Sequence, residues 1–199
     1  MKIIKSLLGI GFGLFLSYSV ISSEYIDIPG FGGKNLGTGR TKNSISAIVA
    51  GIASKEIYGN SEINLKVKKH FWPDAELTGY TTENSVDTKT DVLLTSARFK
   101  AETDTEDLLN GEVDKSEFDW KVKQTGPNTY KIARWGPKFD ATLELKIEEG
   151  GIIKGTYNRP GPHFDWGIKG TYDKEGNVNI EIDGPLNLGI VLEGKVIKR

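Results

Sequence analysis

The stretch Phe-Asp-Ala-Thr-Leu-Glu-Leu-Lys-Ile, residues 139–147, alternates apolar or small side chains with polar ones at every position. Because successive side chains of a β-strand point to opposite faces, this pattern predicts a strand with one apolar and one charged face. Four other stretches have the same period of two: residues 63–68, 118–123, 177–183 and 186–192. The pattern therefore predicts an antiparallel sheet with one dry face and one face in water.

The breaks between these stretches are marked by turn residues. The pair Gly-Pro occurs four times, at residues 126–127, 136–137, 161–162 and 184–185, and proline both favours turns and interrupts a central ladder. The short spacing predicts a meander, and a long sheet with one dry face must close or fold over. We therefore expect an all-β fold with at most one N-terminal helix, an antiparallel meander that closes into a small barrel of roughly 8–10 strands. A two-sheet sandwich is the alternative.

One segment before the strands has a different period. In residues 44–58 the apolar side chains recur at helical spacing, as in Ile45, Ile48, Val49 and Ile52. The β-branched content and Gly51 favour a strand instead. We predict a helix, which would plug a barrel, cover it or pack on its side.

The N-terminus has the layout of a targeting segment. Residues 1–23 combine Lys2 and Lys5 with an apolar stretch and end in small residues, which is typical of a secretory signal peptide. A retained membrane anchor is the alternative. Five glycines then fall between Gly30 and Gly39. We therefore expect a signal peptide over 1–23, a Gly-rich linker over 24–43 and a single β-rich domain over 44–199. The protein would be exported: secreted, periplasmic or in the cell envelope.

Composition excludes several classes of protein. Lys and Arg number 26 against 27 Asp and Glu, which excludes a strongly basic nucleic-acid binder. A mean hydropathy of −0.35 with 37% hydrophobic residues excludes a bundle of membrane helices. The absence of cysteine excludes thiol catalysis, cysteine metal sites and disulfides.

No catalytic or metal-binding motif stands out. The two histidines, His70 and His163, show no ligand spacing, and the chain has no Gly-x-Ser-x-Gly element. The acidic residues 103–116 fail the spacing of a calcium loop and are predicted to form a solvated loop. We therefore predict a non-enzymatic protein without catalytic residues, cofactor or metal.

The aromatic side chains are the candidate site. They lie on the apolar faces of the predicted strands and would either fill a core or line an apolar ligand cavity. The candidates are Phe118, Trp120, Phe139, Phe164, Trp166 and Tyr172.

Three functions remain open, and a fourth, an enzyme, has no sequence motif to support it. The first is an exported barrel that binds a small apolar or lipid-like ligand. The second is a secreted or cell-surface interaction module with a filled core, binding a protein or cell-envelope partner through strand edges or the loop 103–116. The third is a small transmembrane β-barrel with its apolar face toward lipid. No nucleic-acid partner is expected, and the oligomeric state stays open.

Overall fold

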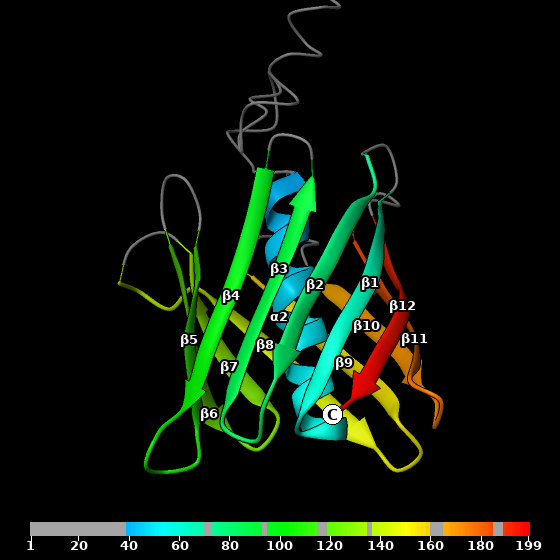
Figure 1. Cartoon of the computed structure of the whole chain (residues 1–199). Helices are drawn as coiled ribbons and strands as arrows, with labels where there is room; N and C mark the ends of the chain where they lie inside the picture. Colours follow the sequence, from blue (N-terminus) through cyan, green and yellow to red (C-terminus); the bar gives the residue numbers. More distant parts are fainter. Residues whose placement is uncertain are drawn as a thin grey trace, which may run out of the picture. The chain divides into compact units, whose positions relative to one another are not determined.

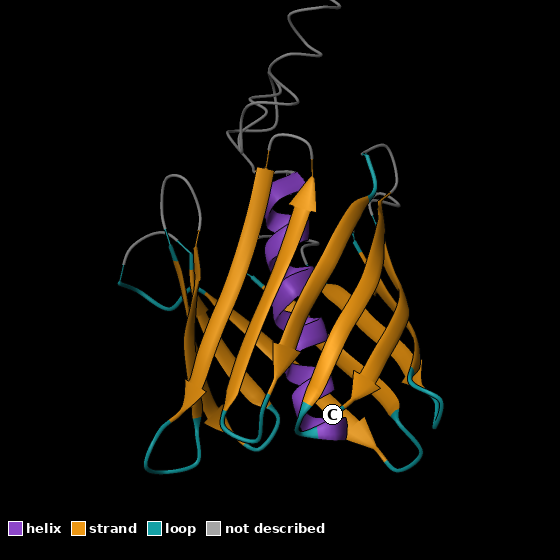
Figure 2. Cartoon of the chain, viewed as in Figure 1, coloured by secondary structure: helices purple, strands orange, loops and turns teal. Residues whose placement is uncertain are grey.

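The computed structural model describes residues 39–69, 73–92, 95–114, 119–134, 137–159, 165–184 and 189–199. This part of the chain holds one helix and twelve strands (Figure 2). The helix is α2 (Gly39–Tyr58), and the strands are β1 (Ser61–Lys69), β2 (Ala75–Thr81), β3 (Ser85–Val92), β4 (Thr95–Thr103), β5 (Leu109–Asp114), β6 (Trp120–Gly126), β7 (Thr129–Ala133), β8 (Ala141–Glu148), β9 (Ile152–Asn158), β10 (Trp166–Tyr172), β11 (Asn177–Asp183) and β12 (Ile190–Lys198).

The strands form one closed antiparallel barrel in sequence order (Figure 1). Each described strand pairs with its neighbours in the chain, and β1 pairs with β12 over nine residues, from Ser61 opposite Lys198 to Lys69 opposite Ile190. The predicted all-β meander barrel is confirmed, whereas the sandwich alternative is wrong. The described residues form twelve strands, more than the roughly 8–10 expected for a small closed barrel.

Two strands account for part of the higher count. β5 lies inside the acidic stretch predicted as a loop, so that prediction is wrong for Leu109–Asp114. Its inward positions are Leu109, Gly111 and Val113, which give only a weak apolar period. β3 has buried Thr88 and Thr90 at inward positions, so its sequence lacks the apolar alternation that identifies a strand.

The apolar faces of the strands point inward, and the charged faces point outward. In β1, for example, Ile63, Leu65 and Val67 are buried, while Lys66 and Lys68 are exposed. Outward charges pair along and across strands, as in Lys68 with Glu193, Lys169 with Glu181, and Lys154 with Glu148. A transmembrane barrel requires the opposite arrangement, with apolar side chains on the outer wall.

The predicted helix is confirmed, and it lies inside the barrel (Figure 1). It begins at Gly39, earlier than the expected Ser44, so residues 39–43 are helical although the linker was predicted to reach 43. From Asn43 to Ala53 every residue is buried, whichever side of the helix it occupies. A helix that is buried all round needs no polar face. Helix and barrel form one compact unit from Asn43 to Arg199.

One side of the helix approaches β3 closely. The Thr90 hydroxyl donates to the carbonyl of Asn43 at 3.2 Å, and the Thr88 hydroxyl donates to the carbonyl of Ala47 at 2.9 Å. One helical step of four residues rises about 6.0 Å, and two residues of a strand span about 6.6 Å. Every fourth residue of the helix therefore lies beside every second residue of β3. Gly51, four residues after Ala47, is the next helical residue on this side.

The opposite wall of the barrel is built from large side chains. Ser54 of the helix and Tyr172 of β10 join their hydroxyls at 3.1 Å. The Tyr58 ring lies 5.9 Å from that of Tyr172, and its hydroxyl donates to the carbonyl of Asp173. Strands β6 to β10 contribute five buried aromatic side chains, which are Trp120, Tyr130, Tyr157, Trp166 and Tyr172, whereas β4 contributes one, Phe99. The small residues Thr88, Thr90 and Gly51 let the helix lie close to β3. The larger aromatic rings fill the wider space between the helix and strands β6 to β10.

Candidate functional site

The structure divides the six predicted aromatic residues into three groups. Trp120, Trp166 and Tyr172 are buried in the barrel interior. Phe139 is 39% exposed, so its expected interior position is wrong. Phe118 and Phe164 lie outside the described residues.

The exposure of Phe139 has a local cause. The strand begins only at Ala141, and the preceding residue, Asp140, turns its carboxylate toward Arg134. The apolar alternation thus continues in sequence beyond the end of the paired strand, where it no longer determines which side faces inward.

The buried aromatic residues share the interior with α2. The contact of Tyr172 with Ser54 and Tyr58 shows this directly. This placement favours the interpretation in which the rings fill a core around the helix.

Three cationic side chains lie at one end of the barrel, where the odd-numbered strands finish. Lys69 ends β1, Arg134 follows β7, and Arg159 follows β9. All three residues are largely buried, with at most 8% of their surface exposed. We call this end the cationic rim, defined by Lys69, Arg134 and Arg159.

Arg134 is held by a carboxylate. Its Nη2 donates to Oδ2 of Asp140 at 2.7 Å, its Nε donates to the same oxygen at 3.1 Å, and its backbone N–H donates to Oδ1 at 3.1 Å. This two-pronged contact fixes the plane of the guanidinium. The neighbouring carboxylate and hydroxyl raise the pKa of Arg134 against the opposing effect of burial.

Tyr157 and Arg159 lie beside this pair. Burial raises the pKa of the Tyr157 hydroxyl to about 12, and the charges of Arg134 and Arg159 act in the opposite direction. Burial also lowers the pKa of Arg159, and the charge of Arg134 lowers it further. The charges of the two guanidinium groups thus oppose the effect of burial on the pKa of the Tyr157 hydroxyl.

Trp166 extends the same cluster. It lies opposite Tyr157 in the β9–β10 register, and the two rings meet edge to face with centroids 6.2 Å apart. The Tyr157 hydroxyl and the Trp166 indole N–H are buried, and neither has a hydrogen-bond partner among the described residues. These are two polar groups whose burial is costly without a partner.

Lys69 is a rim residue that contacts the helix. Its Nζ donates to Oδ1 of Asn43 at 2.8 Å. Burial lowers its pKa to about 8, and the charge of Asp74 opposes this effect. Lys69 thus joins the end of β1 to the helix.

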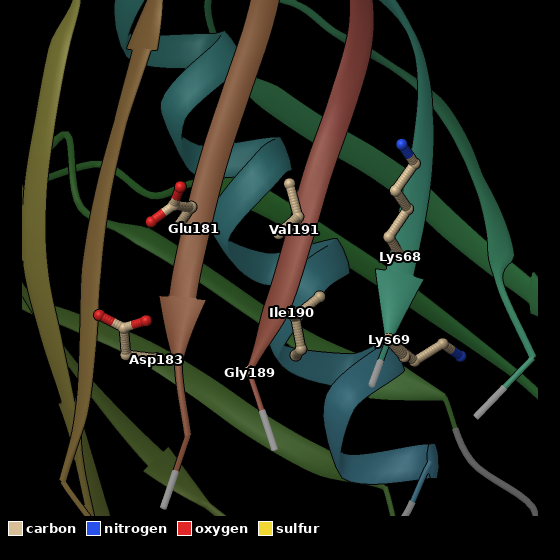
Figure 3. A pocket seen from close by; sticks show the side chains of 7 residues that line it. All are labelled: Lys68, Lys69, Glu181, Asp183, Gly189, Ile190 and Val191. Atoms are coloured by element: carbon tan, nitrogen blue, oxygen red, sulfur yellow. The ribbon is translucent and has the colours of Figure 1, made fainter. Parts of the chain in front are cut away.

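An open groove runs over the outer wall next to this rim (Figure 3). Lys68 stands on one side and Glu181 and Asp183 on the other, with β12 between them (Figure 3). The charges are already engaged, because Lys68 pairs with Glu193 and both carboxylates face Lys169. The charged side chains on both sides of the groove therefore already have ion-pair partners on the outer wall.

The sequence analysis missed the cationic rim, although part of its signal is visible. Lys69 continues the inward series Ile63, Leu65 and Val67, and Arg159 follows Tyr157 at the same period. A charged residue in phase with a buried face is such a signal. The sequence gives no such signal for Arg134, because Ala133 and Arg134 are both buried and the alternation is broken there.

Comparison with known proteins gives no relative: no family model, curated protein or solved structure matches the chain. Within the described ranges, no helix has the length and apolar character to cross a membrane. Fold and site together define the class, a twelve-stranded antiparallel β-barrel filled by its own helix, with buried cations at one rim.

Proposed function

We propose that the protein is an exported, non-enzymatic binding module whose filled barrel is a scaffold. The observation that carries this proposal is the helix inside the barrel, buried on all sides from Asn43 to Ala53. The export rests on the signal-like residues 1–23.

The helix favours this function over the carriage of an apolar ligand. Barrels that hold small molecules leave their interior free for them, whereas here α2 and the aromatic rings share that space. Hydrogen bonds from Thr88, Thr90 and Lys69 tie the helix to two strands. An apolar ligand would have to displace these contacts.

Recognition then takes place at the rims and the outer wall. Strand addition needs a free edge, and each described strand already has two neighbours. The expected use of strand edges therefore has no support in a closed barrel. Next to the cationic rim, the buried Tyr157 hydroxyl and Trp166 indole N–H have no hydrogen-bond partner among the described residues.

Native mass spectrometry of the purified protein with an uncharged apolar probe, 1-dodecanol, tests the filled interior. We expect the bare mass of the chain and no stoichiometric adduct. Two variants locate any adduct: Trp120→Ala alters the interior, and Tyr80→Ala alters the outer wall, where Tyr80 is half exposed. A one-to-one adduct that Trp120→Ala removes and Tyr80→Ala preserves would show an interior ligand site and overturn the proposal.

A further inference from the structure

We infer that the outer wall over β12, β1, β2 and β3 binds a neutral oligosaccharide, with the ring of Tyr80 stacked against one sugar ring. We call this surface the Tyr80 face, defined by Glu62, Tyr80, Asp87, Arg98 and Ile197. The inference rests on the proposed function and deepens it, because it names the chemical class that the binding module recognises.

The Tyr80 face contains a row of outward side chains that crosses four neighbouring strands. Ile197 lies opposite Glu62, Glu62 lies opposite Tyr80, and Tyr80 lies opposite Asp87. The strands β1, β2 and β3 lie side by side in the near wall of Figure 1. Three gaps of about 4.8 Å between strands make the row about 14 Å long, which accommodates more than one sugar ring.

Two side chains of this row expose apolar surface to water. Tyr80 is 50% and Ile197 is 49% exposed, and they are two of the four large apolar side chains that are exposed among the described residues. A single exposed apolar residue needs no explanation, but these two flank the same residue, Glu62. The apolar C–H face of a sugar ring would cover the Tyr80 ring and remove it from water.

The Tyr80 ring is held in place before any ligand arrives. Its hydroxyl donates to Oδ2 of Asp87 at 3.2 Å, and Asp87 also accepts from Nε and Nη2 of Arg98 at 2.8 and 2.6 Å. This two-pronged contact fixes the plane of the Arg98 guanidinium. Binding then costs little conformational entropy, because the side chains are already ordered.

The charges of the Tyr80 face favour an uncharged ligand. An open groove lies at this face, and the three cations in its lining each pair with a carboxylate: Arg98 with Asp87, Arg199 with Glu62, and Lys89 with Asp91. Each charge therefore has its opposite beside it, and the groove attracts an ion only weakly.

The paired groups keep hydrogen-bonding capacity for such a ligand. A guanidinium carries several N–H donors, and a carboxylate carries several acceptor lone pairs. Asp87 engages Nε and Nη2 of Arg98, so Nη1 has no acceptor among the described residues. Donors and acceptors thus lie side by side, and a sugar hydroxyl, which both donates and accepts, can use both. A sugar combines such hydroxyls with an apolar face.

A polypeptide ligand is the alternative, and this wall suits it less. An extended peptide binds to a sheet through backbone hydrogen bonds at a free edge. Each described strand of this wall already pairs on both sides. Only side chains are therefore offered to a ligand here.

NMR titration of the backbone amide signals of the purified protein tests the inference. The probes are three neutral oligosaccharides, cellopentaose, maltopentaose and N-acetylated chitopentaose, and the uncharged peptide end-capped penta-alanine. We expect at least one oligosaccharide to move the signals of Glu62 and Tyr80 saturably, while the signal of Ile152 on β9 stays in place. If no oligosaccharide moves them, the inference is wrong. If penta-alanine alone moves them, the face binds polypeptide, and the inference is wrong as well.

Three variants give the matched comparison with the oligosaccharide that binds. Tyr80→Ala removes the ring and is expected to weaken binding by about ten-fold or more. Tyr80→Phe keeps the ring and loses only the hydrogen bond to Asp87, so it should weaken binding less. Ile152→Ala is the control, because Ile152 is 41% exposed and lies outside the Tyr80 face, and its binding should equal that of the unchanged protein. Equal affinity of the Tyr80→Ala and Ile152→Ala proteins would overturn the inference.

A further variant keeps the test decisive if Tyr80→Ala does not fold, which circular dichroism checks. Arg98→Met removes a donor and leaves the ring in place, and it should weaken binding as well. The test is independent of the filled interior: an interior adduct with 1-dodecanol would overturn the proposed function and leave the outer wall unaffected. Failure of the oligosaccharide titration would leave the filled barrel standing.

Discussion

At the scale of single residues, Gly51 shows how packing can favour glycine over alanine inside a helix. Glycine inside a helix costs up to about 1 kcal/mol relative to alanine. Here a Cβ built on Gly51 would lie 2.5 Å from Cγ1 of Val86 and 3.2 Å from Cγ2 of Thr88. Those atoms belong to β3, which also donates hydrogen bonds from Thr88 and Thr90 to the helix backbone, so the missing side chain is what permits this approach.

We therefore expect Gly51→Ala to destabilise the protein, although the change improves helix propensity. The overpacking should lower the free energy of unfolding by about 1–3 kcal/mol, measured by urea denaturation. Gly126→Ala is the control, since nothing lies within 4 Å of a Cβ at that position, and it should change stability by no more than about 0.5 kcal/mol. Equal stability of both variants would contradict the close approach of α2 to β3.

Lys69 gives a prediction about pH. Its pKa is about 8 in the folded protein, against an ordinary value of 10.5. Between these values the unfolded chain holds more protons than the folded one, so the contribution of Lys69 to stability rises with pH. Below pH 8 the group is charged in both states, and its burial is a constant cost.

We expect the stability of the unchanged protein relative to Lys69→Met to increase between pH 8 and 10.5 and to stay level from pH 6 to 7. Urea denaturation of both proteins over this range measures the difference. A difference that does not vary with pH would show that Lys69 is not buried in its charged form.

At the scale of elements, the sequence determines strands where apolar and polar residues alternate and fails where they do not. β1, β8 and β11 follow their alternation closely, with buried and exposed residues at the predicted positions. The sequence analysis missed β3 because two of its inward residues, Thr88 and Thr90, are polar. Their hydroxyls donate hydrogen bonds to the helix. The helix was predictable from spacing, but its place inside the barrel depends on which strands close around it.

The helix should be required for the barrel to fold. Without α2 the strands would enclose an unfilled space lined by apolar side chains, and such voids are strongly unfavourable. We expect a chain of residues 59–199 to unfold without a cooperative transition and to bind an apolar dye. A synthetic peptide of residues 39–58 should restore the transition, whereas a peptide with Ile48→Asp should not. Cooperative unfolding of the truncated chain alone would contradict this role.

At the scale of the whole molecule, one factor separates the predicted features from the missed ones: whether they depend on neighbouring residues or on distant segments of the chain. Residues 63–68 and 139–147 predicted strands with one dry face, because that information is local. The number of strands, the filled interior and the cationic rim depend on contacts between distant segments. Trp120, Trp166 and Tyr172 were correctly placed in the interior, but Arg134 and Arg159 meet only after β7 and β9 have joined the same wall.

The pairing of β1 with β12 also determines when folding can finish. Arg199 contacts Glu62 across 137 positions of the chain, and β1 gains its second neighbour only when β12 has been made. During synthesis the ring therefore stays open until β12 has left the ribosome. A chain that must cross a membrane unfolded would gain from this delay, because premature closure would trap it on the wrong side.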